Sequence, residues 1–566
     1  MTIATGASVT RRGRSRGRRW LPMLYLAVMM VAAVLILPSA LRPPPDPSTE
    51  SGALSPDAPP DPNNPDQIIQ SQQQAAGGGA GAVAGGSTTT TTAAAGTPPP
   101  PGITTTAPPR RKAGSGFCFG KPPRQIESVY AGPCTPGFVG DNGGATSKNV
   151  TANEVRLGFT NLGSPAKGRV PDQPTPNESS GTRTFRVFQQ YFNQRYETYG
   201  RRVVFYGTGD PASASAGDQQ AQATSMADDP AFKLFGLYST SQTMCEDYVQ
   251  KGLVAMCDPL SHPEYVANRP GLFSFEMDLN QMVGMGVEYA CKTLVGKLTK
   301  FGGADVNGKP RKFGFVTYRN TQGGVTASDF DKAFDKECGG KATSIELSSE
   351  GDPNNAAAAM TKFRAEGVTT ILFSQVVGNL ILLMSQPNGT YNPEWVMFGN
   401  YAIDNNTIAS ILPKDQSAHL FGISGREWPQ NAQASECFRA YHSIDPDNDP
   451  DGSACFVHWQ ILVNMMNGIQ GAGPKLTPAS FQQALFGLGH RYGQTPWAIG
   501  GGYGPDDYTY MDNVGEVWFD SAAFDSSNGA PGAYRWTHGG TRYERGKLTG
   551  DDTQLFKAGS AQAPPG

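Results

Sequence analysis

Short apolar runs alternate with helical stretches from Glu154 onward. In the first half of this pattern four runs rich in β-formers are each followed by a helix-like stretch: EVRLGFTN, RRVVFYGTG, FKLFGLYSTS and LVAMCDPL. The first helical stretch carries aromatic residues at three- and four-residue spacing, which forms one apolar stripe: Phe185, Phe188, Phe192, Tyr196 and Tyr199. This alternation predicts an α/β fold with parallel sheets and ligand sites at the carboxyl ends of the strands.

A second series of strands follows a long helix that we expect over about 279–299. These strands are predicted in RKFGFVTYRN, ATSIELSS, TTILFSQVV, EWVMFGNY and HLFGISGREW. Three helical patterns occupy 432–488, and VGEVWFD and GAYRWTHGGTRYERG indicate antiparallel strands with a Gly-Gly turn.

The folded body, about 116–548, is too long for one compact core, so we predict two Rossmann-like lobes with parallel sheets. We place lobe 1 at about 150–278 and 420–500, and lobe 2 at about 279–419 and 501–548. The polar tail, 549–566, is predicted to be disordered.

The N-terminal leader, 1–41, has the pattern of an export segment. The first 45 residues contain no acid, and six arginines precede an apolar run of 18 residues, Trp20 to Leu37. Arginine ahead of such a run keeps the N-terminus cytoplasmic and sends the following chain outward. The length suits a retained anchor or the core of a cleaved signal peptide, and we favour the anchor. We therefore expect the extracellular face of the cell membrane, with a tether through residues 20–37, or secretion if the leader is cleaved.

Residues 42–115 cannot form a core, because they consist largely of Pro, Thr, Gly and Ala and contain almost no large apolar side chain. They indicate a disordered spacer that holds the folded body away from the membrane. A mucin-like glycosylated stalk is the alternative.

The chain has eight cysteines, an even set that suits an oxidising compartment. About 105 pairings are formally possible. We predict nearest-neighbour disulfides because short loops close easily, which pairs Cys118 with Cys134, Cys245 with Cys257, Cys291 with Cys338, and Cys437 with Cys455.

Other chemistries find little support. The net charge is −3 and no basic block follows the leader, so we expect no nucleic-acid partner. There is no zinc-type cysteine spacing, no G-x-S-x-G and no H-E-x-x-H, and we expect no catalytic residue, cofactor or metal. The segment 447–458 has the register of a calcium loop, but His458 replaces the twelfth-position glutamate. We favour an acidic surface loop there.

Several motifs, in their order and spacing, resemble the type 1 periplasmic binding proteins that serve branched-chain amino acid ABC transporters, in the version common in actinobacteria. They are GLYSTSQT, MCDPLSHPEY, FSFEMDLNQ, FGFVTYRNTQGG and GAYRWTHGGTRY, and the resemblance covers about 150–545. It implies two lobes joined by three crossovers, which close around a ligand held by the loops at the strand ends.

Ser239, Thr240 and Ser241 lie between a strand end and a helix start. Their hydroxyls and free N–H groups can hold a ligand carboxylate, or they can cap their own helix, and both interpretations stay open. The resemblance further implies a ligand contact from the Pro259 carbonyl and from the Ser261 hydroxyl.

The resemblance also implies an ammonium contact from Asp278, while neighbouring positions depart from the family pattern. Gln322 stands where many relatives have tyrosine, and FGNY offers Tyr401 where amino-acid binders often have glutamate. Ser374 and Gln375 are neutral as well, so an ammonium partner is less certain, although Asp278 or Asp404 could serve.

We predict a non-enzymatic solute-binding protein that captures a small polar ligand, an amino acid or related carboxylate, by lobe closure. Its expected partners are that small molecule and the ABC permease complex in the membrane. Two alternatives stay open: a ligand-sensing receptor domain that reports to a membrane partner, and an exported hydrolase.

Overall fold

The structure, a computed structural model, describes most of the chain from Cys118 onward. The described residues are 118–160, 163–209, 215–258, 269–318, 326–348, 351–374, 377–387, 389–399, 404–428, 432–493, 498–525, 530–557, 559 and 561. The predicted anchor, Trp20 to Leu37, and the predicted spacer lie outside them. Within the described ranges, no helix is both long enough and apolar enough to cross a membrane.

The first lobe is built on a six-stranded sheet with the strand order β2-β3-β1-β4-β5-β6. All neighbours pair in parallel except the short edge strand β2. The strands are β1 (Glu154–Phe159), β2 (Gly168–Arg169), β3 (Arg202–Gly207), β4 (Gly236–Ser239), β5 (Val254–Cys257) and β6 (Leu272–Phe273).

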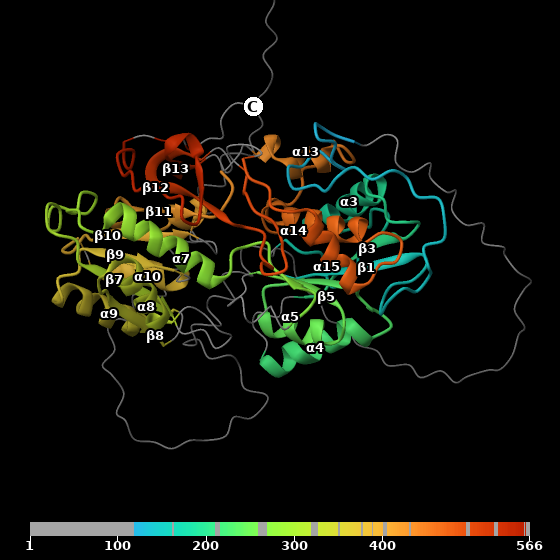
Figure 1. The fold of residues 1–566 in the computed structure, drawn as a ribbon, viewed down its shortest axis with the longest axis horizontal. Coiled ribbons are helices and arrows are strands. Elements are labelled where there is room, and N and C mark those ends of the chain that lie inside the picture. Colours follow the sequence, from blue (N-terminus) through green and yellow to red (C-terminus); the bar gives the residue numbers. More distant parts are fainter. Residues whose placement is uncertain are drawn as a thin grey trace, which may run out of the picture. The chain divides into compact units, whose positions relative to one another are not determined.

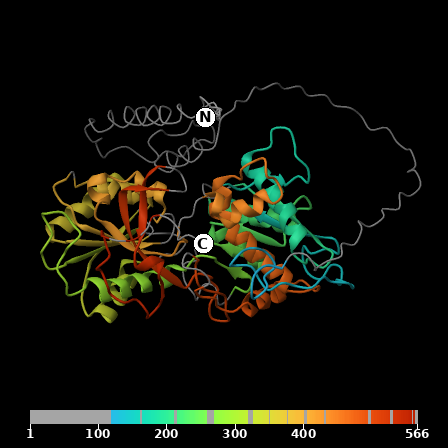
Figure 2. The ribbon, with the colours of Figure 1, turned by 90° about the horizontal axis from the view of Figure 1, so that it is seen from above.

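Helices from two distant parts of the chain cover this sheet. The early ones are α3 (Ser180–Arg195), α4 (Ala216–Asp228) and α5 (Gln242–Gln250). The late ones are η4 (Ala432–Ala434), α13 (Glu436–His442), α14 (Gly452–Gly471) and α15 (Pro478–Gly487). Both ribbon views show the late helices, in orange, beside the early strands and helices (Figures 1 and 2).

The second lobe is built on an eight-stranded sheet with the order β13-β12-β11-β10-β9-β7-β8, and β14 pairs with β12. Its strands are β7 (Phe313–Tyr318), β8 (Thr343–Leu347), β9 (Thr370–Phe373), β10 (Glu394–Gly399), β11 (Leu420–Ser424), β12 (Asn513–Phe524), β13 (Pro531–Trp536) and β14 (Arg542–Glu544). Its helices are α7 (Leu279–Tyr289), η3 (Ala290–Leu294), α8 (Ala327–Cys338), α9 (Pro353–Ala365), α10 (Val377–Ser385), α11 (Asn406–Ser410), α12 (Lys414–Ser417) and η5 (His538–Gly540). The strands β7 to β11 are parallel, whereas β12 to β14 are antiparallel, as the sequence predicts.

The central strands of each sheet are buried on both faces, which explains their nearly continuous apolar runs. In β3, Phe205 packs into the core beneath α3, while Val204 faces the separate core beside α4 and α5. In β10, Phe398 and Met397 face two cores in the same alternating way. The mixed α/β fold with mainly parallel sheets is therefore confirmed.

The chain passes between the lobes three times, through residues 274–278, 425–435 and 488–512. We expected the return to the first lobe at about residue 420. Instead, β11 pairs with β10 and β12 of the second sheet, so the return follows Ser424. The apolar run that forms β11 predicts a strand, but it does not indicate which of the two sheets the strand joins.

Two helix ends differ from the prediction. Helix α3 ends at Arg195, so Tyr199 lies beyond it, with a positive φ of 58°. The long helix expected over 279–299 ends with a π-helical turn, Ala290–Leu294.

The predicted disorder of the tail is wrong for residues 549–557. Leu555 is fully buried, Asp552 pairs with Lys300 at 3.1 Å, and Phe556 packs on Phe301 at 5.2 Å between ring centroids. Two apolar side chains in an otherwise polar segment are enough to dock it on the second lobe.

The four predicted disulfides are confirmed, with Cα–Cα distances of 5.1–6.2 Å. They tie neighbouring elements together rather than the two lobes. Cys245 and Cys257 join α5 to β5, Cys291 and Cys338 join η3 to α8, Cys437 and Cys455 join α13 to α14, and Cys118 and Cys134 close a loop ahead of β1.

Candidate functional site

The loop after β4 uses two of its three hydroxyls inside the protein. Ser241 caps α5, because its Oγ accepts from the Met244 N–H at 3.2 Å and donates to Gln219 Oε1 at 2.8 Å. Ser239 Oγ accepts from the Ser241 N–H at 3.0 Å. Thr240 is partly exposed, and its hydroxyl has no hydrogen-bond partner within the described part of the chain. Of the three, Thr240 is the one left available to a ligand.

Asp278 lies at the N-terminus of α7 in a capping box. Its carboxylate accepts from the Gln281 N–H at 2.8 Å, and the Gln281 side chain accepts from the Asp278 N–H at 2.9 Å. Gln281 Oε1 also accepts from the Thr509 hydroxyl at 2.8 Å. These contacts brace the first crossover against the third.

The other predicted positions divide between a buried residue and residues outside the described ranges. Ser374 directly follows β9, is fully buried, and places its Oγ 4.0 Å from Met282 Sδ of α7. Five predicted site residues lie outside the described ranges: Pro259, Ser261, Gln322, Gln375 and Tyr401.

Four charged residues, which we name the charge cluster, gather where strand ends of both sheets meet two crossovers. Asp258 directly follows β5, and Asp404 follows β10 along the chain. Glu276 belongs to the first crossover and Arg426 to the second. The ends of the first and second sheets thus contribute to a single group of charges.

Arg426 connects this cluster. Its Nε donates to Asp404 Oδ1 at 3.0 Å, and its Nη2 lies 3.6 Å from Glu276 Oε1. The guanidinium also stacks over the ring of Phe456, in α14 of the first lobe, at 4.4 Å. Asp404 is held further by the Ser424 hydroxyl, which donates to Oδ2 at 2.7 Å.

Asp258 fixes the path of the first crossover. Its Oδ1 accepts from the N–H groups of Phe275 at 2.8 Å and Glu276 at 3.3 Å, and from the Ser274 hydroxyl. This carboxylate therefore holds the Glu276 backbone against the carboxyl end of β5.

The cluster is both buried and negative. Burial raises the pKa of Glu276 to about 7; Arg426 opposes this shift, and Asp258 and Asp404 add to it. Burial also raises the pKa of Asp258. Although burial disfavours the charge of Arg426, Asp404 and Glu276 raise its pKa above the usual value.

One oxygen of the cluster lacks a partner. Glu276 Oε2 is buried and accepts no hydrogen bond from the described residues. A buried carboxylate oxygen in this state is costly unless a donor reaches it. Three carboxylates around one guanidinium therefore form a site that suits a cationic donor.

The sequence prediction named Asp404 as a possible ammonium partner but missed Asp258, Glu276 and Arg426. The available signal was position, since Asp258 follows an apolar strand and Arg426 follows another. Their convergence depends on the crossovers, which a linear pattern does not show.

The calcium register at 447–458 does not form a calcium loop. Asp451 caps α14 by accepting from the Ser453 and Ala454 N–H groups at 2.9 Å and 3.2 Å. His458, the twelfth position, is buried within α14 and packs on Phe185 at 5.1 Å between ring centroids. The helix start removes the coordinating geometry that the register requires.

Comparisons with known proteins find similarity in structure alone. No family model matches the chain, and no curated protein matches it. A solute-binding protein of an ABC transporter from Rhodopseudomonas palustris, in complex with 3,4-dihydroxybenzoic acid, is 12% identical with a TM-score of 0.46, covering 69% of this chain and 98% of its own. A fatty acid ABC transporter substrate-binding protein from Thermomonospora curvata is 15% identical with a TM-score of 0.46, covering 70% and 93%.

A leucine-binding protein from Thermotoga maritima is 10% identical with a TM-score of 0.46, covering 69% of this chain and 99% of its own. The ligands in these descriptions belong to those proteins. Two of these three solved structures are described as solute- or substrate-binding proteins of ABC transporters, and the third as a leucine-binding protein.

Proposed function

We propose that this protein is an extracellular solute-binding protein that captures a small ligand bearing an ammonium group, such as an amino acid, for an ABC importer. The observation that carries this proposal is the buried Glu276 Oε2, which has no donor within the described residues. A ligand ammonium supplies that donor as a charge-assisted hydrogen bond.

The position of the charge cluster suits binding by lobe closure. Asp258 and the stacking partner Phe456 belong to the first lobe, whereas Asp404 belongs to the second. Glu276 and Arg426 lie on the crossovers that join the lobes. A ligand held there contacts both lobes, and its differential contacts to the open and closed states favour the closed one.

A carboxylate on the same ligand has a candidate partner in Thr240. This hydroxyl lies next to the N-terminus of α5, where free N–H groups and the helix dipole favour an anion. Tyr238, two residues earlier, lies close enough to Arg426 to affect its ionisation, which puts the end of β4 near the charge cluster.

The cysteines support an extracellular location. Four disulfides and no free cysteine among the described residues favour an oxidising environment outside the cytoplasm. In this proposal residues 20–37 anchor the chain and 42–115 hold the binding lobes at a distance that lets them reach the permease.

Thermal shift tests the proposal directly, because a ligand that binds only the native state stabilises it by about 2.7 kcal/mol at a hundredfold excess over Kd. The panel pairs each amino acid with the same molecule lacking the amine. We expect a rise in Tm with ammonium-bearing members alone. Stabilisation by amine-free members alone would contradict the proposal, and consumption of a ligand during incubation would favour the hydrolase.

A further inference from the structure

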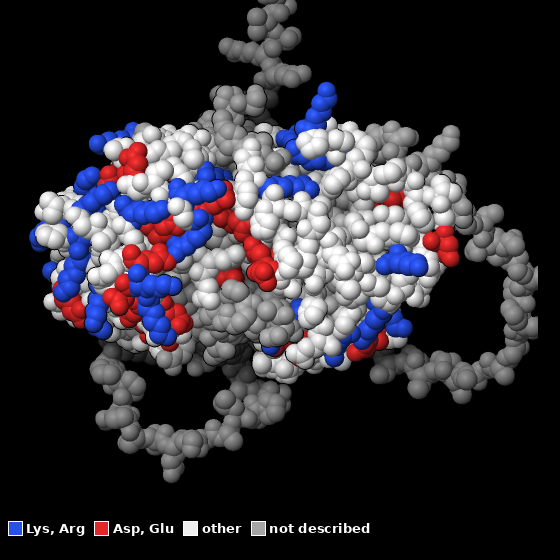
Figure 3. All heavy atoms as spheres, in the orientation of Figure 1, with Lys and Arg blue, Asp and Glu red and all other residues white. Residues whose placement is uncertain are grey.

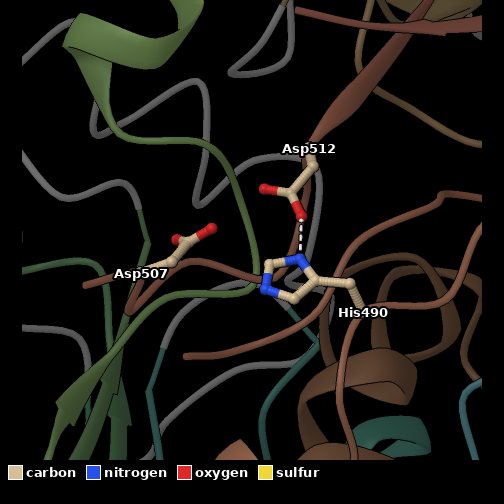
Figure 4. Close-up of side chains that lie close together, drawn as sticks. All are labelled: His490, Asp507 and Asp512. Atoms are coloured by element: carbon tan, nitrogen blue, oxygen red, sulfur yellow. Dashed lines mark hydrogen bonds and ion pairs between the residues drawn. The ribbon is translucent and has the colours of Figure 1, made fainter. Parts of the chain in front are cut away.

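The third crossover folds back on itself and brings three metal-ligating side chains together (Figure 4). Gly501 forms bridges with both Arg491 and Met511, which places the segment after α15 beside the segment before β12. His490, Asp507 and Asp512 each offer a ligand atom, and these atoms lie within 4.8 Å of one another. No other group of three His, Cys, Asp or Glu side chains in the described ranges converges in this way.

Neighbouring groups orient these side chains. His490 Nδ1 lies 2.9 Å from Asp512 Oδ2, and the Tyr492 hydroxyl donates to the same oxygen at 3.1 Å. Asp507 Oδ1 accepts from the Thr509 N–H at 3.1 Å and from its hydroxyl at 2.8 Å. Hydrogen bonds of this kind hold ligands in place around a bound metal.

Figure 4 shows the Asp507 carboxylate, the Asp512 carboxylate and the His490 ring facing one another. His490 Nδ1 is the ring nitrogen that faces Asp512 Oδ2. With the ring proton on Nε2, which makes no hydrogen bond within the described residues, Nδ1 is free to bind a metal ion together with the two carboxylates.

The carboxylates of this group favour a bound cation. Asp507 and Asp512 bring two carboxylates within 4.8 Å of one imidazole, so a bound cation would balance their charge. A second observation points the same way: the Tyr503 hydroxyl is buried without a hydrogen-bond partner among the described residues. Burial raises the pKa of Tyr503, and Asp258 is the carboxylate that adds most to this shift, ahead of Asp507 and Asp512.

We propose that His490, Asp507 and Asp512 form a binding site for a divalent transition-metal ion, with Zn²⁺ as the best fit. One imidazole nitrogen and two carboxylate oxygens are a donor set that Zn²⁺ accepts, with water to complete its tetrahedron. Ca²⁺ and Mg²⁺ prefer oxygen ligands throughout and fit this group less well.

The bound ion stiffens the junction between the lobes. The Thr509 hydroxyl lies 2.8 Å from both Asp507 Oδ1 and Oε1 of Gln281 in the α7 capping box, and its single proton is shared between these two acceptors. The Tyr510 N–H donates to the Ser274 carbonyl at 3.0 Å. The site is therefore connected to the first crossover as well as built on the third. This inference is independent of which solute the protein carries.

Titration calorimetry on the full chain, stripped with EDTA and kept in detergent, tests the site with Zn²⁺, Ca²⁺ and Mg²⁺ at pH 7.5. We expect one Zn²⁺ per chain, bound at least about a hundredfold more tightly than Ca²⁺ or Mg²⁺. His490→Ala and Asp507→Asn, at an exposed and a half-buried position, should each weaken Zn²⁺ binding at least about tenfold, with folding checked by circular dichroism.

A matched control is His442→Ala, which removes another histidine–aspartate pair. His442 Nε2 lies 3.0 Å from Asp449 Oδ1, and both residues precede α14, whereas His490 follows it. It should leave Zn²⁺ binding unchanged. Absence of Zn²⁺ binding to the wild-type chain, or an affinity unchanged in both folded site variants, would overturn the proposal. Equal weakening by His442→Ala would assign the ion to the 442–449 loop instead.

Discussion

The loop after β4 and the charge cluster both lie at carboxyl ends of strands, yet their polar atoms are in opposite states. Ser239 and Ser241 are satisfied by one another, by a helix N–H and by Gln219. In the charge cluster Glu276 Oε2 is buried without a donor among the described residues. A place at a strand end is therefore not enough to mark a binding residue, and an unsatisfied buried atom is the stronger indicator.

The surface charges of the second lobe offer a second contrast. In the face drawn in Figure 3, Lys, Arg, Asp and Glu gather over the side that carries β7 to β13 and are sparse on the other side. Ion pairs of the second lobe include Lys292 with Glu288 at 2.8 Å and Arg545 with the same carboxylate at 3.1 Å. The Lys292 and Arg545 side chains are exposed by 39% and 44%, so solvent screens these pairs, unlike the cluster around Arg426.

The largest effect should follow from removing the cation of the charge cluster. Arg426→Met leaves Asp404, which is fully buried, and Glu276, whose side chain is 17% exposed, without their cation. We expect the free energy of unfolding to fall by about 3–5 kcal/mol, measured by urea denaturation. Arg439→Met, which breaks an exposed pair with Glu127, is the control and should cost at most about 1 kcal/mol. Equal losses in the two variants would remove the distinction between buried and exposed charge.

The next effect concerns ligand affinity. Glu276→Gln keeps the shape of the side chain but removes its charge, so an ammonium ligand found by thermal shift should bind about 10- to 100-fold more weakly by calorimetry. The exposed Asp447→Asn variant is the matched control. If Asp278→Asn weakened binding more than Glu276→Gln did, the ammonium partner would be the position implied by the family resemblance and not the charge cluster.

The pH dependence of stability distinguishes the two regions next. Because the pKa of Glu276 is raised to about 7 in the folded state, native protein holds a proton that the unfolded chain has released above its ordinary pKa of 4.5. This group therefore contributes stability below about pH 4.5, and that stability is lost as pH rises toward 7. We expect a slope of up to about 1.4 kcal/mol per pH unit that disappears in Glu276→Gln. The same slope in the variant would show that other groups produce it.

The smallest effects are expected in the loop after β4. Ser241→Ala removes the cap of α5 and should lower the free energy of unfolding by about 1 kcal/mol with little change in affinity. Thr240→Ala should do the reverse, with unchanged stability and affinity reduced up to about tenfold. Thermal melts and calorimetry on both variants measure this split. Weaker ligand binding in Ser241→Ala at full stability would return its hydroxyl to the ligand site.

Local pattern by itself determined much of this fold. Each predicted run forms a strand, and in the central strands alternate positions face two different cores, which requires apolar side chains on both faces. The aromatic stripe of Phe185, Phe188 and Phe192 is fully buried, as helical spacing requires. Near-neighbour disulfides were predictable as well, since short loops limit where a cysteine can find its partner.

Only the tertiary structure decided which elements share a sheet and which charges share a site. The membership of β11 in the second sheet depends on its hydrogen bonds to β10 and β12, which no run of apolar residues encodes. Asp258, Glu276 and Arg426 are separated by up to 168 positions in the sequence and meet because two crossovers bring strand ends together. Burial and pairing depend on every neighbour at once, so the charge state of such a cluster emerges from packing and cannot be read from the order of residues.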